Sequence, residues 1–447
     1  MIAILRRSTA CGCVIVALTV SAFTQSSPIA SPESVGMSSE RLGRLTRVLD
    51  EYARTKQVAG TVTLVRRAGR IVYFQAAGMR DIEKGVPMTT DTIFRIASQT
   101  KAITSVGVMM LVEDGRLLLT DPVAKHLPAF ATTTVRATGS GETLNAVAAR
   151  RPITIRDLLT HTAGVSYGGE PELQERYAAA GLTQWYFADK TRPIAALVDT
   201  IATLPFEAQP GERFVYGYST DILGALIEKV SGMPLDRYVA SRILDPLKMT
   251  DTHFFLPASK ASRLAAVYSR TANTPVQRAP ETTKALLGGG LGQGQYADGP
   301  RAAFSGGAGL LSTASDYARF LQMMLNKGEL DGVRLLSPKT VELMTVNHIG
   351  TLYTTPGRGF GLGFETVDDL GRSGRYGSEG EFSWGGAYFS RYWVDPQEQL
   401  VVVFMTQLIP NGGSDLQEKL RVLVTQAIAG PPQGERMTTT AALPRPK

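Results

Sequence analysis

The chain has 447 residues, 43% hydrophobic and 19% charged, a composition typical of a globular protein with enough apolar material for a large core. Its 47 basic and 40 acidic residues give a net charge of +7 and are spread along the chain. Because no basic block interleaved with aromatic residues is present, we expect no nucleic-acid partner and predict only a mildly basic, solvated surface.

The N-terminus has the pattern of a secretory signal peptide, which we place at residues 1–24. Arg6 and Arg7 precede an apolar stretch, and residues 20–22 are small, as cleavage requires. The stretch is short for a mature anchor, although an uncleaved anchor is the alternative. We therefore expect a periplasmic or secreted protein without stable membrane insertion. Cys11 and Cys13 would leave with the signal, so neither a disulfide nor a thiol nucleophile is expected.

The first predicted elements after the signal are a helix and a hairpin. Apolar residues at helical spacing predict an amphipathic helix over residues 39–54. Two runs rich in β-branched and aromatic residues, at 61–65 and 70–74, flank a turn at 67–69 and predict paired strands. The middle of the chain, from about 98 to 350, is mostly helical in pattern and is interrupted by loops rich in glycine and proline.

Strand patterns return near the C-terminus. Residues 382–393 and 399–405 lie on either side of the turn dipeptide Asp395-Pro396 and predict a second hairpin, and residues 415–428 predict a closing helix. The glycine-rich stretch 286–300 lacks G-x-G-x-x-G and predicts a flexible loop rather than a phosphate site.

Strands at both ends of the chain and helices between them predict an α+β fold. We expect one antiparallel sheet built from both chain ends, flanked by the terminal helices, with an inserted helical subdomain at about 100–350. This arrangement would be a single domain over residues 32–430, followed by a disordered tail at 431–447. The seam between the sheet and the helices is a natural place for a binding cleft.

The stretch AGVSYGG at 163–169 contains G-x-S-x-G, the nucleophile elbow of α/β-hydrolases, with Ser166 at its centre. An elbow requires a strand before the serine and a helix after it. Here the apolar spacing of residues 155–161 is helical, and residues 168–171 have the composition of a loop. We therefore predict that Ser166 is not a nucleophile and that it lies in a loop beside the cleft, where Tyr167 contacts the substrate.

Ser98 is a better candidate because it belongs to an S-x-x-K pattern with Lys101. The apolar run 102–112 predicts a buried helix with Ser98 in its first turn, so the two side chains would share one face. The helix N-terminus favours negative charge near Ser98, and a desolvated Lys101 could accept the serine proton. The alternative is that Ser98 only caps the helix and that Lys101 extends into solvent.

Two later stretches favour the catalytic interpretation. Tyr216 follows the turn at 210–211 and precedes an apolar helix at 222–230, and a tyrosine beside a lysine can share a proton with a serine. The alternative for Tyr216 is an ordinary core residue. Further on, the strand pattern contains the stretch 384–387, with consecutive glycines whose N–H groups could bind an oxyanion, although a simple bulge is the alternative.

Taken in order and spacing, these three patterns resemble the serine β-lactamase and penicillin-binding-protein superfamily. They are S-x-x-K at Ser98, P-G-x-x-F-x-Y ending at Tyr216, and W-G-G beginning at Trp384. Within the superfamily the chain is most similar to the family VIII carboxylesterases, relatives of class C β-lactamases, over about residues 32–429. The resemblance implies a β-lactamase/transpeptidase-like fold and a mechanism that needs no metal and no organic cofactor.

The resemblance also implies roles for individual residues. Ser98 would be the acyl-forming nucleophile, and Lys101 and Tyr216 would be the base pair that moves its proton. The N–H groups of Ser98 and Ala387 would form the oxyanion hole. The residues expected to contact the substrate are Trp384, Gly385, Gly386, Tyr218 and Tyr167.

Two departures from class C β-lactamases separate this chain from them. Tyr218 stands where they have the asparagine of Tyr-x-Asn, and Trp384 stands where they have the lysine of Lys-Thr-Gly. That lysine pairs with a substrate carboxylate, whereas a tryptophan offers an apolar wall that suits neutral esters. We therefore expect an exported carboxylesterase acting on small esters. The alternatives are a β-lactamase, a D-amino-acid peptidase or amidase, and a non-catalytic penicillin-recognising protein.

Overall fold

The computed structural model describes residues 29–137, 145–169, 171–182, 185–187, 191–280, 293, 296–297 and 302–432. The expected signal peptide, most of the glycine-rich stretch 286–300 and all but two residues of the expected tail lie outside these ranges. Within them, no helix is long and apolar enough to cross a membrane.

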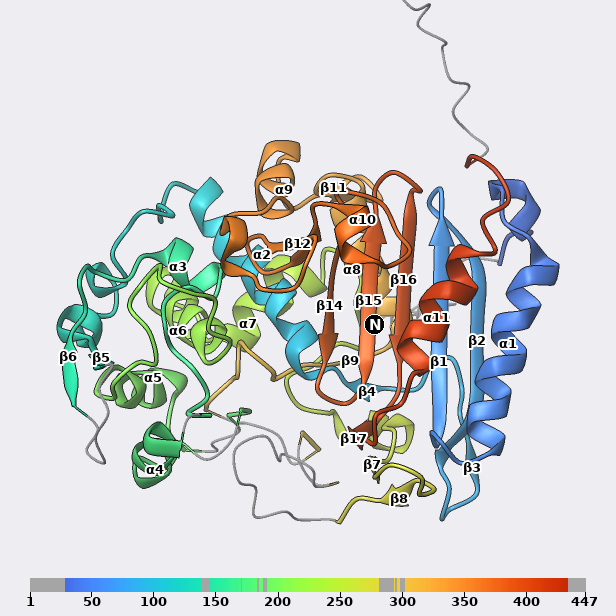
Figure 1. The fold of residues 1–447 in the computed structure, drawn as a ribbon, viewed down its shortest axis with the longest axis horizontal. Coiled ribbons are helices and arrows are strands. Elements are labelled where there is room, and N and C mark those ends of the chain that lie inside the picture. Colours follow the sequence, from blue (N-terminus) through green and yellow to red (C-terminus); the bar gives the residue numbers. More distant parts are fainter. Residues whose placement is uncertain are drawn as a thin grey trace, which may run out of the picture.

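One eight-stranded antiparallel sheet combines strands from both chain ends, as the sequence predicts (Figure 1). The N-terminal strand β1 (Gly60–Arg67) pairs with the C-terminal strand β16 (Leu400–Met405), with Val62 opposite Met405 and Arg67 opposite Leu400. Across the sheet the strands are β12 (Arg358–Phe360), β13 (Glu365–Val367), β14 (Phe382–Gly386), β15 (Ser390–Asp395), β16 (Leu400–Met405), β1 (Gly60–Arg67), β2 (Arg70–Asp81) and β3 (Val86–Pro87).

The two faces of the sheet bury different sets of side chains, because successive residues of a strand point to opposite faces. Along β16, Val402 and Phe404 pack under the terminal helices α1 (Ser39–Arg54) and α11 (Leu416–Thr425). Val401 and Val403 face the larger core, which contains α8 (Ala314–Leu325). The α+β prediction, with terminal helices covering a sheet from both chain ends, is therefore confirmed.

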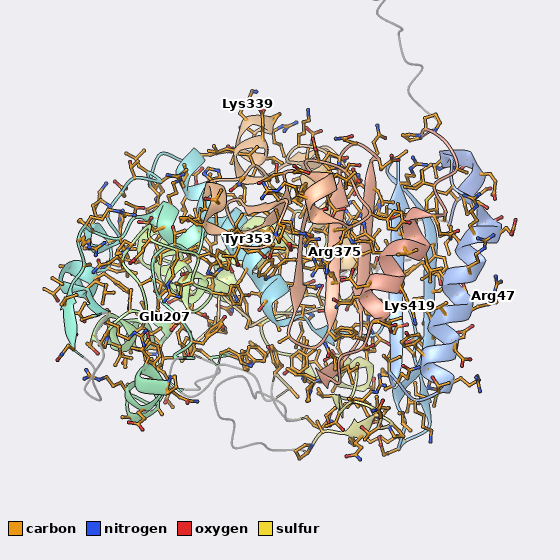
Figure 2. The ribbon with its side chains drawn as sticks, in the orientation of Figure 1. Arg47, Glu207, Lys339, Tyr353, Arg375 and Lys419 are labelled. Atoms are coloured by element: carbon orange, nitrogen blue, oxygen red, sulfur yellow. The ribbon has the colours of Figure 1, made fainter. Side chains whose placement is uncertain are left out.

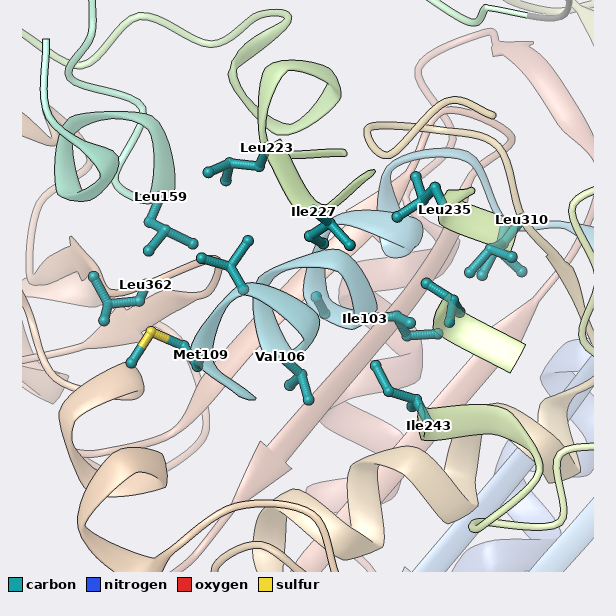
Figure 3. Close-up of a cluster of buried hydrophobic side chains, with 14 of the residues drawn as sticks. Ile103, Val106, Met109, Leu159, Leu223, Ile227, Leu235, Ile243, Leu310 and Leu362 are labelled. Carbon is teal, nitrogen blue, oxygen red and sulfur yellow. The ribbon is translucent and has the colours of Figure 1, made fainter. Parts of the chain in front are cut away.

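The central helix α2 (Thr100–Glu113) lies between the sheet and the helical part of the molecule (Figure 1). Its apolar side chains, including Ile103, Val106 and Met109, pack among Leu223 and Ile227 (Figure 3). The other helices are α3 (Ile155–Leu159), α4 (Pro171–Ala179), α5 (Ile194–Ala202), α6 (Ser219–Ser231), α7 (Leu235–Val239), α9 (Pro338–Met344) and α10 (Leu370–Ser373).

Short strand pairs complete the connections. Most of them are antiparallel, and β17 (Leu408–Asn411) pairs in parallel with β7 (Tyr268–Arg270). They are β4 (Phe94–Arg95) with β9 (Leu311–Ser312), β5 (Thr134–Arg136) with β6 (Ala146–Ala148), β10 (Glu329–Leu330) with β11 (Val333–Arg334), and β7 (Tyr268–Arg270) with β8 (Gln277–Arg278) and β17 (Leu408–Asn411). Charged side chains such as Arg47 on α1 and Lys339 on α9 point outward into solvent (Figure 2).

The structure corrects the predicted C-terminal hairpin. Residues 382–393 do not form one strand, because the chain reverses after Gly386 and returns as β15. Phe389 adopts a φ of 66° in this turn, and its N–H donates a hydrogen bond to the Gly386 carbonyl over 3.0 Å. A phenylalanine is not a typical residue for a left-handed turn, so the pattern gave no sign of the reversal. The closing helix is also shorter than predicted, since it begins after Asp415 and ends at Thr425.

Candidate active site

Ser98 lies in a short 3-10 turn, Ala97–Gln99, immediately before α2, rather than in the first turn of the helix as predicted. Ala97 is fully buried and has a φ of 43°, a left-handed backbone conformation that residues other than glycine rarely adopt. Neighbouring elements fix the turn, since the Tyr317 hydroxyl donates to the Gln99 carbonyl over 2.8 Å and the Leu310 N–H donates to Thr100 Oγ1 over 3.0 Å. Backbone strain of this kind persists where packing enforces it, often at functional residues.

Lys101 is buried at the start of α2, and its ammonium group reaches Ser98. Its Nζ lies 3.4 Å from Ser98 Oγ, 3.0 Å from the Tyr167 hydroxyl and 2.9 Å from the Gly307 carbonyl oxygen. Only 2% of the residue is exposed, so the alternative in which Lys101 extends into solvent is wrong. The 3-10 turn and the first turn of α2 place the two side chains together, as their spacing predicts.

Tyr216 lies against Lys101 and is contacted by the strand tryptophan. Lys101 Nζ lies 4.6 Å from the centroid of the Tyr216 ring, within the range of a cation–π interaction. The Tyr216 hydroxyl accepts a hydrogen bond from Trp384 Nε1 over 3.2 Å. The structure therefore brings Ser98, Lys101, Tyr216 and Trp384 together from the 3-10 turn, α2, the loop before α6, and β14.

The other predicted contact residues lie in two places. Tyr167 is half-buried beside Tyr216, with ring centroids 5.8 Å apart. Tyr218 has no exposed surface; it lies beneath Tyr167, with ring centroids 4.8 Å apart, and stacks on Phe187. The position of Tyr218 therefore does not support the direct substrate contact that we expected, and its observed contacts include Tyr167 and Phe187.

The end of β14 packs closely against the residues that precede Ser98. A side chain at Gly386 would collide with the Ile96 carbonyl, so glycine is required for this approach. Gly385 and Gly386 are half-buried, and Ala387 is exposed in the turn that follows β14. The predicted partners of the oxyanion hole, Ser98 and Ala387, thus belong to two segments that pack against each other at Gly386.

Ser166 lies in a buried loop, and its surroundings are not those of an elbow. The helix α3 precedes it, and Ser166 Oγ accepts a hydrogen bond from the Gly168 N–H over 3.0 Å. Gly164 and Gly168 both have positive φ, of 85° and 75°, and a side chain at Gly164 would collide with the Ala208 carbonyl. The two glycines of the G-x-S-x-G pattern are therefore explained by turn geometry and close packing.

The loop at 161–169 is tied to the loop that carries Tyr216. The Val215 N–H donates to the His161 carbonyl, and the Glu207 N–H donates to the Gly164 carbonyl, each over 2.8 Å. The helix α3 before it begins with a capping box in which Thr154 and Asp157 satisfy each other's backbone N–H groups. Tyr167 and Tyr216 are therefore positioned by one connected pair of loops.

Two residues next to the site were not predicted to belong to it. His161 is buried with its ring centroid 4.7 Å from that of Tyr216, and burial lowers its pKa well below its ordinary value, so the imidazole is neutral. Asp221 is a fully buried carboxylate on α6. Both residues lie in stretches that the family resemblance covers. The only feature of the sequence that could have indicated a role for either residue is that it is polar and lies beside apolar residues. No cluster of three potential metal ligands occurs among the described residues.

Comparison with known proteins identifies the family. The beta-lactamase family model matches residues 45–427. The chain belongs to the beta-lactamase family. Protein Rv1367c of Mycobacterium tuberculosis is 34% identical over 404 residues, which cover 86% of this chain and 92% of that protein.

Esterases are among the relatives in this family. Esterase EstB of Burkholderia gladioli is 31% identical over 382 residues, covering 83% of this chain and 91% of EstB. The structure of EstCE1, described as a hydrolase with promiscuous acyltransferase activity, is 28% identical with a TM-score of 0.72 and covers 86% of this chain and 99% of EstCE1. These similarities support the branch that the W-G-G pattern indicates, and the chain is a serine-hydrolase-type member of the family.

Proposed function

We propose that this protein is an exported carboxylesterase that cleaves small neutral esters through an acyl-enzyme on Ser98. The observation that carries the proposal is the contact of Lys101 Nζ with Ser98 Oγ. In the same site, Trp384 donates a hydrogen bond to the Tyr216 hydroxyl. Two relatives support hydrolysis as the reaction class: EstB is named an esterase, and EstCE1 is described as a hydrolase.

In the proposed acylation step, Ser98 Oγ attacks the ester carbonyl carbon while its proton passes to the Lys101–Tyr216 pair. The N–H groups of Ser98 and Ala387 would bind the resulting oxyanion. Collapse of the tetrahedral intermediate breaks the bond to the alcohol oxygen, and the pair returns the proton to the leaving alcohol. A water molecule then attacks the acyl carbon in the same way, which releases the carboxylic acid and restores Ser98.

The substrate class follows from the side chains around the nucleophile. Trp384 and Tyr216 are both half-buried and form an aromatic wall, with ring centroids 5.4 Å apart. The buried Phe360 supports this wall, with its ring centroid 5.3 Å from that of Trp384 and 5.1 Å from that of Phe214. Lys101 is occupied by Ser98, Tyr167 and Gly307, so it is not placed as a partner for a substrate carboxylate. An aromatic wall favours apolar acyl or alcohol groups over anionic β-lactams.

The test measures the hydrolysis of three substrates by one preparation of the protein. The substrates are p-nitrophenyl butyrate, the anilide of butyric acid, and a cephalosporin. The proposal predicts that kcat/KM for the ester exceeds that for the other two by several orders of magnitude. Comparable turnover of the cephalosporin would favour the β-lactamase or peptidase alternative. Absence of turnover together with absence of covalent labelling by a serine-reactive phosphonate would favour a non-catalytic penicillin-recognising protein.

Export is a separate part of the proposal and has its own test. We expect the full chain, expressed in a Gram-negative host, to be recovered from the periplasm or medium with an N-terminus near residue 25. Recovery from the membrane fraction with residues 1–24 intact would instead support the uncleaved anchor.

A further inference from the structure

A buried carboxylate lies behind the catalytic lysine. Asp221 is in the first turn of α6, five residues after Tyr216, and its side chain is fully buried. Its Oδ1 accepts hydrogen bonds from Ser305 Oγ over 2.6 Å and from the Gly307 N–H over 3.1 Å. Its Oδ2 has no hydrogen-bond partner among the described residues. Burying a carboxylate costs free energy unless hydrogen bonds and an opposite charge compensate it, so the groups around Asp221 must supply that compensation.

A hydrogen-bonded chain connects Asp221 with Lys101. Ser305 Oγ, which donates to Asp221, accepts a hydrogen bond from the Ala308 N–H over 3.1 Å. The carbonyl of the same peptide group, that of Gly307, accepts the hydrogen bond from Lys101 Nζ over 2.9 Å. One peptide group therefore stands between the carboxylate and the ammonium, with its N–H held toward Asp221 through Ser305 and its carbonyl oxygen held toward Lys101.

The turn that carries this peptide group is clamped between two helices. From α2, Thr104 Oγ1 donates to the Gly306 carbonyl over 2.8 Å. On the other side, a side chain at Gly307 would collide with Asp221 Oδ2, and one at Gly306 would collide with the Thr220 carbonyl of α6. Because these approaches leave no room for adjustment, a change at Asp221 would be transmitted to the Gly307 carbonyl.

Four ionisable side chains near the two charges are neutral near pH 7. Burial raises the pKa values of Tyr167, Tyr218 and Tyr296, and burial lowers that of His161. Tyr216 contacts Lys101 through its ring face. Burial also raises the pKa of Asp221, while the charge of Lys101 and the hydrogen bonds from Ser305 and Gly307 oppose that increase. Asp221 is thus the carboxylate that interacts with the lysine charge in this cluster.

We infer that Asp221 is a positioning residue for the Ser98–Lys101 pair, which fixes the Gly307 carbonyl that Lys101 binds and supplies the negative charge that balances its ammonium. The inference rests on the proposed function, because it assumes that Lys101 moves the Ser98 proton. Removing the carboxylate charge disfavours the protonated amine, so any limb of a pH profile that Lys101 controls moves to lower pH.

The experiment measures the rate of covalent labelling of Ser98 by a p-nitrophenyl phosphonate as a function of pH. Asp221→Asn keeps the shape of the side chain and an oxygen that accepts from Ser305 and Gly307, but it removes the charge. Ser305→Ala is the matched control, because it breaks the Ser305 connection and leaves the charge in place. Thermal unfolding of each variant establishes that it is folded.

We expect Asp221→Asn to shift the Lys101-controlled limb to lower pH by about one pH unit. Ser305→Ala should lower the labelling rate by roughly tenfold without moving the limb. A folded Asp221→Asn variant whose profile coincides with that of the wild type would overturn the inference. If Asp221→Asn does not fold, an unchanged labelling rate in Ser305→Ala overturns it instead. Wild-type protein that is not labelled at all would refute the proposed function, and with it this inference.

Discussion

Trp384 Nε1 donates a hydrogen bond to the Tyr216 hydroxyl over 3.2 Å, so the residue that replaces the strand lysine of class C β-lactamases is bonded directly to the proposed base. Tyr216 is also in contact with Lys101 through its ring face. One indole N–H therefore orients the phenol relative to the lysine, and the indole ring contributes to the apolar wall. Trp384 would act on both binding and catalysis, and these two effects are separable by substitution.

Trp384→Phe retains a smaller aromatic ring in the wall and removes the hydrogen bond to Tyr216. We expect kcat for p-nitrophenyl butyrate to fall by roughly tenfold with little change in KM, since one hydrogen bond to the base is lost. Tyr216→Phe, which removes the hydroxyl itself, should lower kcat by about two to four orders of magnitude. Steady-state kinetics of both variants is the measurement. A Trp384→Phe variant that changes KM alone would show that the indole N–H does not assist the base.

The two serines of the S-x-x-K and G-x-S-x-G patterns give opposite predictions. Ser98→Ala should abolish ester hydrolysis and phosphonate labelling, because it removes the partly exposed serine hydroxyl that lies 3.4 Å from Lys101 Nζ. Ser166→Ala should retain most activity, because Ser166 Oγ is bonded to the Gly168 N–H within its own loop. Mass spectrometry of the labelled protein would locate the adduct. An adduct on Ser166, or loss of activity only in Ser166→Ala, would reverse the assignment.

Local pattern was sufficient where an element is determined by its own residues. The helix α1 spans 39–54 as predicted, because its apolar stripe lies within the segment and its Ser38 cap immediately precedes it. Ser98 and Lys101 were also accessible, since their contact depends on a spacing of three residues. The reversal at Phe389 was not accessible, because the close approach of Gly386 to Ile96 involves two segments 290 positions apart.

The same limit explains the residues that were missed. Asp221 lies within an apolar helix pattern, and its partners Ser305 and Gly307 come from a turn more than 80 residues later in the chain. Tyr218 was expected at the substrate because of its place in the motif, but the structure packs it under Tyr167. Motif position indicated the region of the site, whereas exposure and hydrogen bonding depended on contacts distant in sequence.

Asp316 should make stability depend on pH in the opposite direction to most carboxylates. Burial in α8 raises its pKa to about 6, although hydrogen bonds from the Asp251 N–H and the Thr252 hydroxyl oppose the increase. The folded chain therefore binds this proton more tightly than the unfolded chain. Its stabilising contribution is complete below the ordinary pKa of 3.8 and is lost as the pH rises through about 6.

Asp316→Asn removes this contribution. The free energy of unfolding of Asp316→Asn minus that of the wild type should be about 2 kcal/mol more positive at pH 7.5 than at pH 4.5, so the variant gains relative stability as the pH rises. Urea unfolding at the two pH values is the measurement. Asp199→Asn, an exposed change on α5, controls for the loss of one negative charge. Equal differences for the two variants at both pH values would show that Asp316 does not titrate in this way.

The two glycines Gly164 and Gly169 offer a direct test of the structural explanation for the elbow-like pattern. Gly164 has a φ of 85°, and a Cβ there would collide with the Ala208 carbonyl, whereas a Cβ at Gly169 would have nothing within 4 Å. Gly164→Ala should therefore reduce the free energy of unfolding by about 2 to 4 kcal/mol, and Gly169→Ala should change it by less than about 0.5 kcal/mol.

Gly164→Ala should also lower kcat, because the loop that it would displace carries Tyr167, whose hydroxyl is 3.0 Å from Lys101 Nζ. Gly169→Ala, in the same loop but without a close neighbour, should retain wild-type kinetics. Denaturant unfolding and ester kinetics of the two variants together distinguish a glycine that the backbone conformation requires from a glycine that the reaction requires. If Gly164→Ala were as stable as Gly169→Ala but inactive, the glycine would be required by the reaction itself, and the interpretation of this loop as a support for Tyr167 would be wrong.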